Sequence, residues 1–105
     1  MNNSTLTIDM RNEGVDGAVG RVLGIQVKDK IIRECDSGQY EKVLLDFSKV
    51  DFVTSGFAKE LFGGLYTRFQ QEFNKVVMVR LNKENETLKN TIIRAIATVI
   101  EPPKQ

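Results

Sequence analysis

Histidine is absent from this chain of 105 residues, and cysteine occurs only once. Without histidine, the chain has no histidine-based catalytic triad and no histidine ligand for a metal ion. The lone Cys35 cannot form an intramolecular disulfide, which fits a reducing cytoplasm. It also falls on the apolar stripe of an expected helix, so we expect it to belong to the core rather than to act as a reactive thiol.

Long hydrophobic runs are missing as well. No apolar run approaches the roughly 18 residues expected of a transmembrane span. The N-terminus, Met-Asn-Asn-Ser-Thr, has neither the basic nor the apolar region of a secretory signal. The net charge of +1 lacks the basic excess that is typical of a protein that binds nucleic acid. We therefore expect a cytoplasmic protein that contacts neither membranes nor nucleic acids.

The composition is that of one globular domain. Hydrophobic residues make up 41% of the chain and charged residues 28%, which argues against disorder. A chain of 105 residues is long enough for a single core but too short for two. We expect one domain over residues 1–105, with its core at about 4–100 and a tail at 101–105.

The first third of the chain passes from a strand pattern through turns into a helix pattern. Polar and apolar residues alternate in Ser4–Met10, which predicts a half-buried edge strand. Three glycines between residues 11 and 20 predict turns, and a short second strand around Val15–Val19 would form a hairpin with the first. From Arg21 onward, apolar residues recur every four positions, which predicts a helix that ends at about residues 36–38.

The rest of the chain alternates between strand and helix. Val43–Phe47 and Val76–Val79 are continuous apolar runs that predict strands, and we expect the first to be buried on both faces. Apolar repeats predict helices at about 56–73 and 85–100, the second with Asn85 as its N-cap. Strand–helix–strand units imply right-handed crossovers. The expected fold is α/β, a mostly parallel (mixed) sheet of about four strands with three main helices, and one face or edge left for a partner.

Two adjacent glycines, Gly63 and Gly64, interrupt the second expected helix. Each glycine costs a helix about 1 kcal/mol relative to alanine. Two explanations are open at this point. The glycines allow close packing of the helix on the sheet, or they form a flat patch on which a partner approaches.

Catalytic motifs are weak or absent. The chain has no glycine-rich loop that ends in Gly-Lys-Ser/Thr, and glycines at 14, 17 and 20 do not have the Gly-x-Gly-x-x-Gly spacing. Asp46 and Asp51 suggest a carboxylate pair or a Mg²⁺ site, but Asp46 is better explained as an acceptor of loop hydrogen bonds, with Asp51 solvated. Ser55 has no histidine and no evident lysine base. We therefore expect no enzymatic activity, no cofactor and no metal.

Two hydroxyl residues, Thr54 and Ser55, stand at the start of the second expected helix. That position is the carboxyl edge of the sheet, where ligands and partners meet open α/β folds. A hydroxyl before a helix is ordinarily an N-cap worth about 1 kcal/mol. Alternatively, one of the two hydroxyls is phosphorylated, because a helix N-terminus accommodates a phosphate well and the added charge can reject or recruit a partner.

The segment that contains these hydroxyls, Asp46–Gly63, resembles a known signature. It reads Asp-Phe-Ser-Lys-Val-Asp-Phe-Val-Thr-Ser-Gly-Phe-Ala-Lys-Glu-Leu-Phe-Gly and is similar to that of the bacterial STAS-like domain family of unknown function. The likeness extends from about Gly20 to Ile96. Because this family is related to the STAS domains of anti-sigma factor antagonists, the resemblance implies a four-stranded sheet with helices, no enzymatic activity, and regulation through protein–protein contacts.

The resemblance also implies a partner and a modification. STAS antagonists bind an anti-sigma kinase of the histidine-kinase-like ATPase fold, which phosphorylates a serine in an Asp-Ser-Ser-Gly motif. Aligned without a gap, Thr54 stands in place of the aspartate, and Ser55 and Gly56 in place of the two serines. With a one-residue gap, Ser55 matches the second serine and Val53 the aspartate. The acidic residue is missing in both alignments, and Ser55 and Thr54 are the phosphorylation candidates.

Residues and resemblance together predict a bacterial protein-interaction module that binds a histidine-kinase-like ATPase or an anti-sigma factor and is switched by Ser/Thr phosphorylation. The alternatives are a nucleotide-binding sensor and a structural domain that pairs with itself through an exposed edge strand. We accordingly expect a monomer or a weak homodimer. Asp46 is predicted to organise the loop. The predicted partner-binding residues are Ser48, Asp51, Thr54, Ser55, Gly56, Lys59 and Glu60, and we expect the last two to be exposed and to set partner specificity.

Overall fold

Three parallel strands form the sheet of this protein, in the order β1-β2-β3. The computed structural model describes residues 4–17, 19–38 and 40–100, so the expected tail at 101–105 lies outside the described residues. The strands are β1 (Thr5–Asp9), β2 (Lys42–Asp46) and β3 (Val77–Arg80). The main helices are α1 (Arg21–Ser37), α2 (Ser55–Phe69) and α4 (Glu86–Ile100), and the short ones are η1 (Met10–Glu13), η2 (Gln70–Glu72) and α3 (Phe73–Val76).

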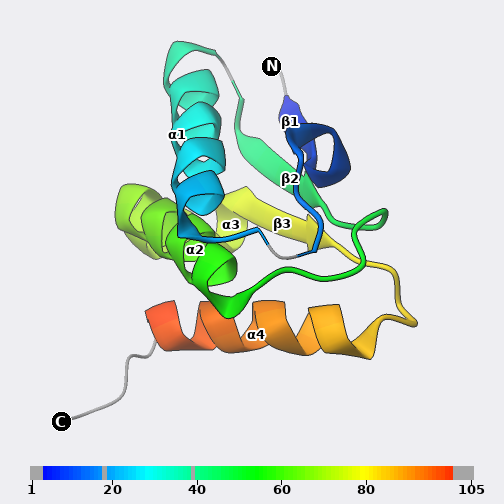
Figure 1. The fold of residues 1–105 in the computed structure, drawn as a ribbon. Coiled ribbons are helices and arrows are strands. Elements are labelled where there is room, and N and C mark those ends of the chain that lie inside the picture. The colour runs from blue at the N-terminus through cyan, green and yellow to red at the C-terminus, as the bar shows by residue number, and fades with distance from the viewer. Residues whose placement is uncertain (1–3, 18, 39, 101–105) are drawn as a thin grey trace, which may run out of the picture.

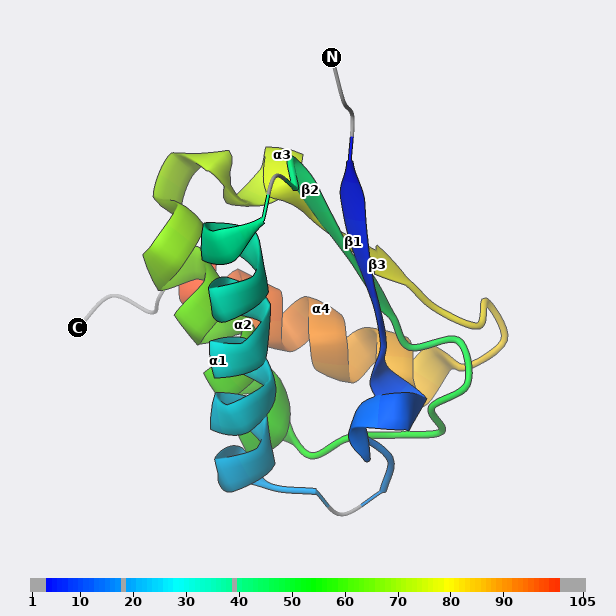
Figure 2. The same ribbon diagram turned by 90° about the horizontal axis from the view of Figure 1, so that it is seen from above.

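Both crossovers between the strands are helical. The chain passes from β1 through α1 to β2 and from β2 through α2 to β3, with Leu6 opposite Val43 and Val43 opposite Val77. Helix α2 packs between α1 and α4, and the three helices lie on one side of the sheet (Figures 1 and 2). The α/β class, the parallel pairing and the three main helices are therefore as expected.

The predicted hairpin strand around Val15–Val19 is wrong for the residues that the structure describes. Gly14 and Gly17 both adopt left-handed backbone, with φ of 83°, which lies outside the regular strand region. The Gly17 N–H donates to the Phe52 carbonyl, 2.8 Å away, instead of to a neighbouring strand. Ala18 lies outside the described residues. The described part of the sheet thus has three strands instead of four, all of them parallel.

The core lies between the sheet and the helix layer. Its largest fully buried side chains include Phe47, Phe57 and Phe62, and the rings of Phe47 and Phe62 stack with their centroids 6.3 Å apart. Cys35 lies at the edge of this core, half-buried, as its place on the apolar stripe predicted. Burial, followed by the charges of Asp36 and Glu34, raises the pKa of the Cys35 thiol against the opposing effect of Arg68. The thiol is therefore less nucleophilic than an exposed cysteine.

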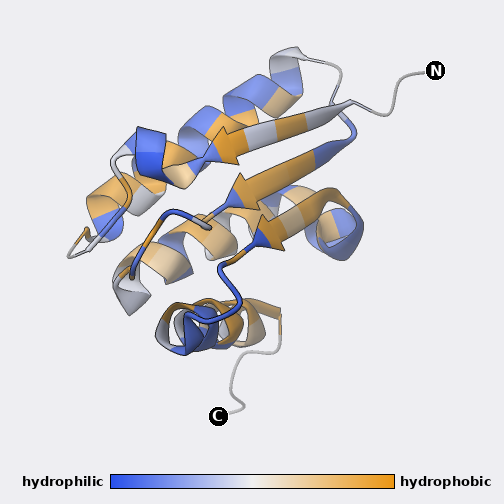
Figure 3. Cartoon of the chain, turned by 90° about the vertical axis from the view of Figure 1, so that its right-hand side faces the viewer, coloured by the Kyte–Doolittle hydropathy of each residue, from blue (hydrophilic) through white to orange (hydrophobic). Residues whose placement is uncertain are grey.

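Over the described residues, no main helix covers the opposite face of the sheet, which is turned toward the viewer in Figure 3. In β2, Val43 and Leu45 are fully buried, whereas Leu44 and Asp46 are half-buried. The expectation that β2 is buried on both faces is therefore wrong. Both crossovers place their helices on the same side, so alternate β2 residues face outward. This result agrees with the separate expectation that one face is left open.

Helix α2 ends earlier than its apolar repeat predicts. Gln70 has a φ of 54°, which breaks the helix after Phe69, and the chain continues through η2 and α3 before β3 begins. Gly63 and Gly64 face the neighbouring helices α4 and α1 instead of the sheet, so the predicted helix–sheet packing is wrong. A Cβ on Gly63 would lie 3.7 Å from Val99 of α4, and one on Gly64 would lie 2.5 Å from the Lys28 side chain of α1.

Helix α4 begins as predicted. The Asn85 side chain accepts a hydrogen bond from the Leu88 N–H at 3.0 Å, which makes Asn85 the N-cap. None of the described helices combines the length and the apolar composition needed to cross a bilayer.

Candidate functional site

The loop between β2 and α2, residues 47–54, carries three of the predicted site residues, Ser48, Asp51 and Thr54, and lies at the carboxyl end of β2 (Figure 1). It begins with a turn in which the Val50 N–H donates to the Phe47 carbonyl at 3.0 Å. The Phe47 N–H in turn donates to the Arg80 carbonyl at 2.8 Å. The loop therefore continues the pairing of β2 with β3 before it turns toward α2.

Asp46 organises this loop, as predicted. Its Oδ1 accepts a hydrogen bond from the Ser48 N–H at 2.9 Å, and its Oδ2 lies 3.6 Å from Nη1 of Arg80. The hydrogen bonds from the Ser48 side chain and N–H, with a smaller contribution from the charge of Arg80, lower the pKa of the Asp46 carboxyl. Ser48 is half-buried, and its hydrogen bonds to Asp46 place it in the framework of the loop.

Thr54 is the N-cap of α2. Its Oγ1 accepts a hydrogen bond from the Phe57 N–H at 3.1 Å and donates one to the Val19 carbonyl at 2.6 Å. The same hydroxyl therefore caps the helix and ties the segment before α1 to the start of α2. The helix-cap interpretation holds for Thr54.

Ser55 is different, although it is the next residue. It is the first residue of α2, it is exposed, and in the described part of the chain no hydrogen bond holds its hydroxyl. The two hydroxyls that the sequence could not tell apart are thus separated by their surroundings. Thr54 has a structural role, and the Ser55 hydroxyl is exposed to solvent.

Three residues that the sequence analysis did not assign to the site brace the loop. Asp16 accepts hydrogen bonds from the N–H groups of Asp51, at 2.9 Å, and Phe52, at 3.4 Å. Asn85 donates from its side chain to the Asp51 carbonyl at 2.7 Å. Arg11 donates to the Lys49 carbonyl at 3.1 Å. Asp16 lies between two glycines in a turn, which is the one sequence signal that hinted at such a role.

Asp51 and Gly56, both predicted to bind a partner, lie on either side of the two hydroxyls. Asp51 is exposed, and its backbone rather than its carboxylate is tied to the bracing residues. Gly56 lies under the side chain of Arg21, whose Cγ would be 3.2 Å from a Cβ at that position. Over residues 4–17, 19–38 and 40–100, no three cysteine or carboxylate side chains gather in a way that would hold a metal ion.

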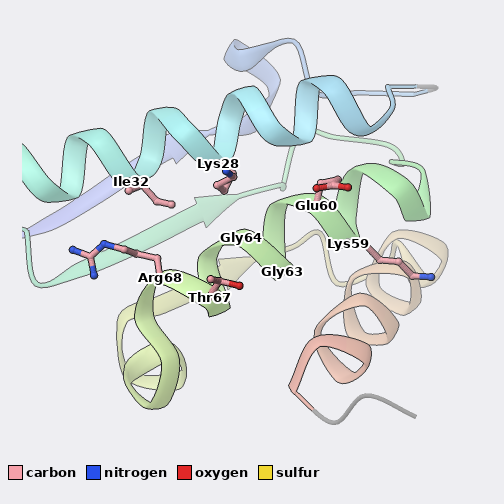
Figure 4. A pocket seen from close by; sticks show the side chains of 8 residues that line it. All are labelled: Lys28, Ile32, Lys59, Glu60, Gly63, Gly64, Thr67 and Arg68. Carbon is pink, nitrogen blue, oxygen red and sulfur yellow. The ribbon is translucent and has the colours of Figure 1, made fainter. Parts of the chain in front are cut away.

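Lys59 and Glu60 separate onto different sides of α2. Glu60 is half-buried and faces α1, where its Cβ would be 3.1 Å from a Cβ at Gly24. The expectation that Glu60 is exposed is therefore wrong, because α1 approaches α2 closely at Gly24. Lys59 is exposed and extends away from α1 (Figure 4).

Two grooves run along α2, one on each side. The groove between α1 and α2 has a volume of about 770 Å³ and passes over Gly63 and Gly64 (Figure 4). The groove between α2 and α4 has a volume of about 400 Å³ and is lined by Ser55 and Lys59 of α2 and by Thr91, Arg94, Ala95, Ala97 and Thr98 of α4. Lys59 lines both grooves. Arg94 had not been predicted as a site residue, because only the packing of α4 on α2 brings it near Ser55.

The comparison with known families gives one match. The sequence model of a family described as a STAS-like domain of unknown function matches residues 24–89, which is more than half of the chain. The matched region contains α2 and the whole β2–α2 loop. No curated protein and no solved structure gives a significant match to the chain.

Proposed function

Because the chain belongs to the family of STAS-like domains of unknown function, we propose that it is a non-enzymatic regulatory module that binds a protein partner. The binding surface is centred on Ser55 and the start of α2. Phosphorylation of Ser55 weakens the complex. The partner has the histidine-kinase-like ATPase fold or is an anti-sigma factor, in keeping with the STAS antagonists that the chain resembles.

The exposed Ser55 hydroxyl is the observation that carries this proposal. It lies at the N-terminus of a helix of 15 residues, and Thr54 already supplies the cap. A phosphate on Ser55 would therefore cost the helix none of its capping hydrogen bonds. The helix dipole favours negative charge at this end.

The modification is a transfer from ATP. The Ser55 Oγ attacks the γ-phosphorus, the new Oγ–P bond forms as the bond to the ADP oxygen breaks, and the hydroxyl proton passes to a base of the kinase. At neutral pH the product carries a charge of about −1.5 to −2. The phosphate thus adds bulk and negative charge at a place where the partner surface is complementary to a small neutral hydroxyl.

A rigid loop supports this use of the surface. Hydrogen bonds with Arg11, Asp16 and Asn85 hold the loop from the β1–α1 connection and from the head of α4. A surface that is ordered before binding loses less conformational entropy when the partner docks. The proposal thus requires no rearrangement of this domain.

Mass spectrometry of the protein purified from the cells that produce it tests the modification. Trypsin releases Val50–Lys59, which contains both Thr54 and Ser55. We expect phosphate on Ser55 and none on Thr54. Phosphate on Thr54 alone would rule out the switch at Ser55. So would a peptide that carries no phosphate in any growth phase or stress.

Capture experiments with matched variants test the binding. Tagged Ser55→Asp is expected to lose the partner that wild type captures, whereas Ser55→Asn, with the same shape and no charge, retains it. Equal capture by Ser55→Asp and wild type would refute the proposed effect of charge at this position.

A further inference from the structure

The groove between α2 and α4 is cationic, and its lining in the described residues contains no carboxylate. Its charged lining residues are Lys59 and Arg94, and its polar ones are the hydroxyl residues Ser55, Thr91 and Thr98. Five ion pairs in the described residues take up other basic side chains, but none of them includes Lys59 or Arg94. The two cations are both exposed and have no acidic group of the groove to neutralise them.

The threonines and alanines that line the groove are small, and the hydroxyl protons of the two threonines already have acceptors. Thr91 and Thr98 donate their hydroxyls to carbonyls one turn earlier in α4, at 3.1 Å and 2.8 Å. Their oxygens are therefore available as acceptors. Ala95 and Ala97 present only methyl groups. Such a lining fits an extended chain, whose N–H groups can donate to hydroxyl oxygens while its acidic side chains reach the two cations.

We propose that this α2–α4 groove binds an acidic peptide segment of the protein partner, with Lys59 and Arg94 pairing with its carboxylates. The inference rests on the proposed function, since the segment belongs to the partner that docks at Ser55. Ser55 and Lys59 lie one turn apart on α2, so a phosphate on Ser55 would compete for the same cations. Phosphorylation would in this way close the groove to the acidic segment.

Two other ligand classes fit less well. A nucleotide usually stacks its base on an aromatic or apolar wall, and the groove lining contains no aromatic side chain. A nucleic acid strand would be attracted by a basic excess, but the net charge of the chain is only +1. The cations are local to the groove, which favours a short acidic segment.

The test is a titration of the ¹⁵N-labelled protein, at low ionic strength, with a synthetic peptide of alternating glutamate and alanine. A second peptide with glutamine in place of glutamate is the control. We expect saturable shifts of the amide signals of Ser55, Lys59, Arg94 and Thr98 with the acidic peptide only. The double variant Lys59→Gln/Arg94→Gln should bind it roughly tenfold more weakly.

A matched double variant, Lys83→Gln/Lys89→Gln, removes two exposed lysines outside the groove and should change the affinity by less than about twofold. Equal weakening in both double variants, or shifts centred on another surface, would overturn the inference. If the groove does not bind the peptide but Ser55→Asp still loses its partner, this inference alone fails. If the groove binds the peptide but capture is insensitive to Ser55→Asp, the groove is retained and the proposed switch fails.

Discussion

Two adjacent hydroxyl residues in this protein have different surroundings and hence different expected roles. Thr54 uses its one hydroxyl as donor and acceptor at once, to Val19 and from Phe57. Ser55 faces solvent. The difference follows from the segment before α1, which reaches Thr54 and does not reach Ser55.

This difference predicts unequal effects on stability. Thr54→Ala should lower the free energy of unfolding by about 1–2 kcal/mol, because it removes the cap and the bond to Val19. Ser55→Ala should change it by less than about 0.5 kcal/mol. Urea unfolding monitored by circular dichroism measures both, and Thr54→Ser, which keeps the hydroxyl, is the control. A larger loss for Ser55→Ala than for Thr54→Ala would contradict the assignment of the cap.

The lowered pKa of Asp46 predicts how stability depends on pH. Its folded-state pKa lies below the unfolded value, so the stabilisation is present above the unfolded pKa of about 4 and is lost as the pH falls through the folded pKa. Asp46→Ala should cost about 1–2 kcal/mol at neutral pH, and its difference from wild type should shrink in acid. Urea unfolding at a series of pH values measures this. Asp51→Ala, at an exposed carboxylate, should change the unfolding free energy by less than about 0.5 kcal/mol.

At the scale of elements, the glycines of α1 and α2 separate into two kinds. Gly24 of α1 lies against α2, where a Cβ would be 2.8 Å from the Phe57 carbonyl oxygen. That oxygen belongs to the backbone and cannot move aside without shifting the helix. A Cβ on Gly63 would meet only Val99, at an ordinary contact distance of 3.7 Å.

Alanine substitutions should therefore have opposite signs at these two positions. Gly24→Ala should destabilise the protein by about 1–3 kcal/mol, because α1 and α2 must move apart. Gly63→Ala should stabilise it by up to about 1 kcal/mol through helix propensity. Thermal unfolding of the two single variants measures both. Stabilisation by Gly24→Ala would show that the α1–α2 contact is looser than described.

The elements also show what the sequence could and could not predict. Each main helix was visible as an apolar repeat, and the Asn85 cap was visible as a residue type in its expected place. The end of α2 was not visible in the sequence. Gln70 adopts its positive φ within a stretch whose apolar repeat continues to Phe73. The open face of β2 was hidden as well, since Leu44 is as apolar as its buried neighbour Leu45.

The candidate site was predictable only as far as it is local in sequence. The hydroxyl pair and the Asp46 turn lie within one segment and were both recognised. Asp16 comes from the β1–α1 connection and Asn85 and Arg94 come from α4 and its cap, and only the tertiary fold brings them to the loop or to the groove beside it. Glu60 was placed wrongly for the same reason, because α1 packs beside it and leaves it half-buried.

On the scale of the whole molecule, the protein has two layers with a helix layer on one side of the sheet. Substitution of two adjacent residues of β2, Leu44 and Leu45, tests this arrangement. Leu45→Ala should cost about 2–5 kcal/mol, since Leu45 is fully buried beneath the helices. Leu44→Ala, on the open face, should cost clearly less, because its side chain is only half-buried. Chemical denaturation distinguishes the two, and equal losses would mean that the open face is covered in solution.

The parallel pairing also has a consequence for the order in which the chain acquires structure. The described sheet has no hairpin, because a whole helix separates each pair of neighbouring strands in the sequence. β2 can therefore pair with β1 only after α1 has been synthesised, and β3 can pair with β2 only after α2 has been synthesised. Such long-range pairing slows folding and delays it relative to synthesis. The loop beside Ser55 receives one of its braces from the head of α4, where the Asn85 side chain donates to the Asp51 carbonyl. Under the proposed function, a nascent chain that lacks α4 would therefore present an unfinished surface, and recognition by a partner would be confined to molecules that have completed their fold.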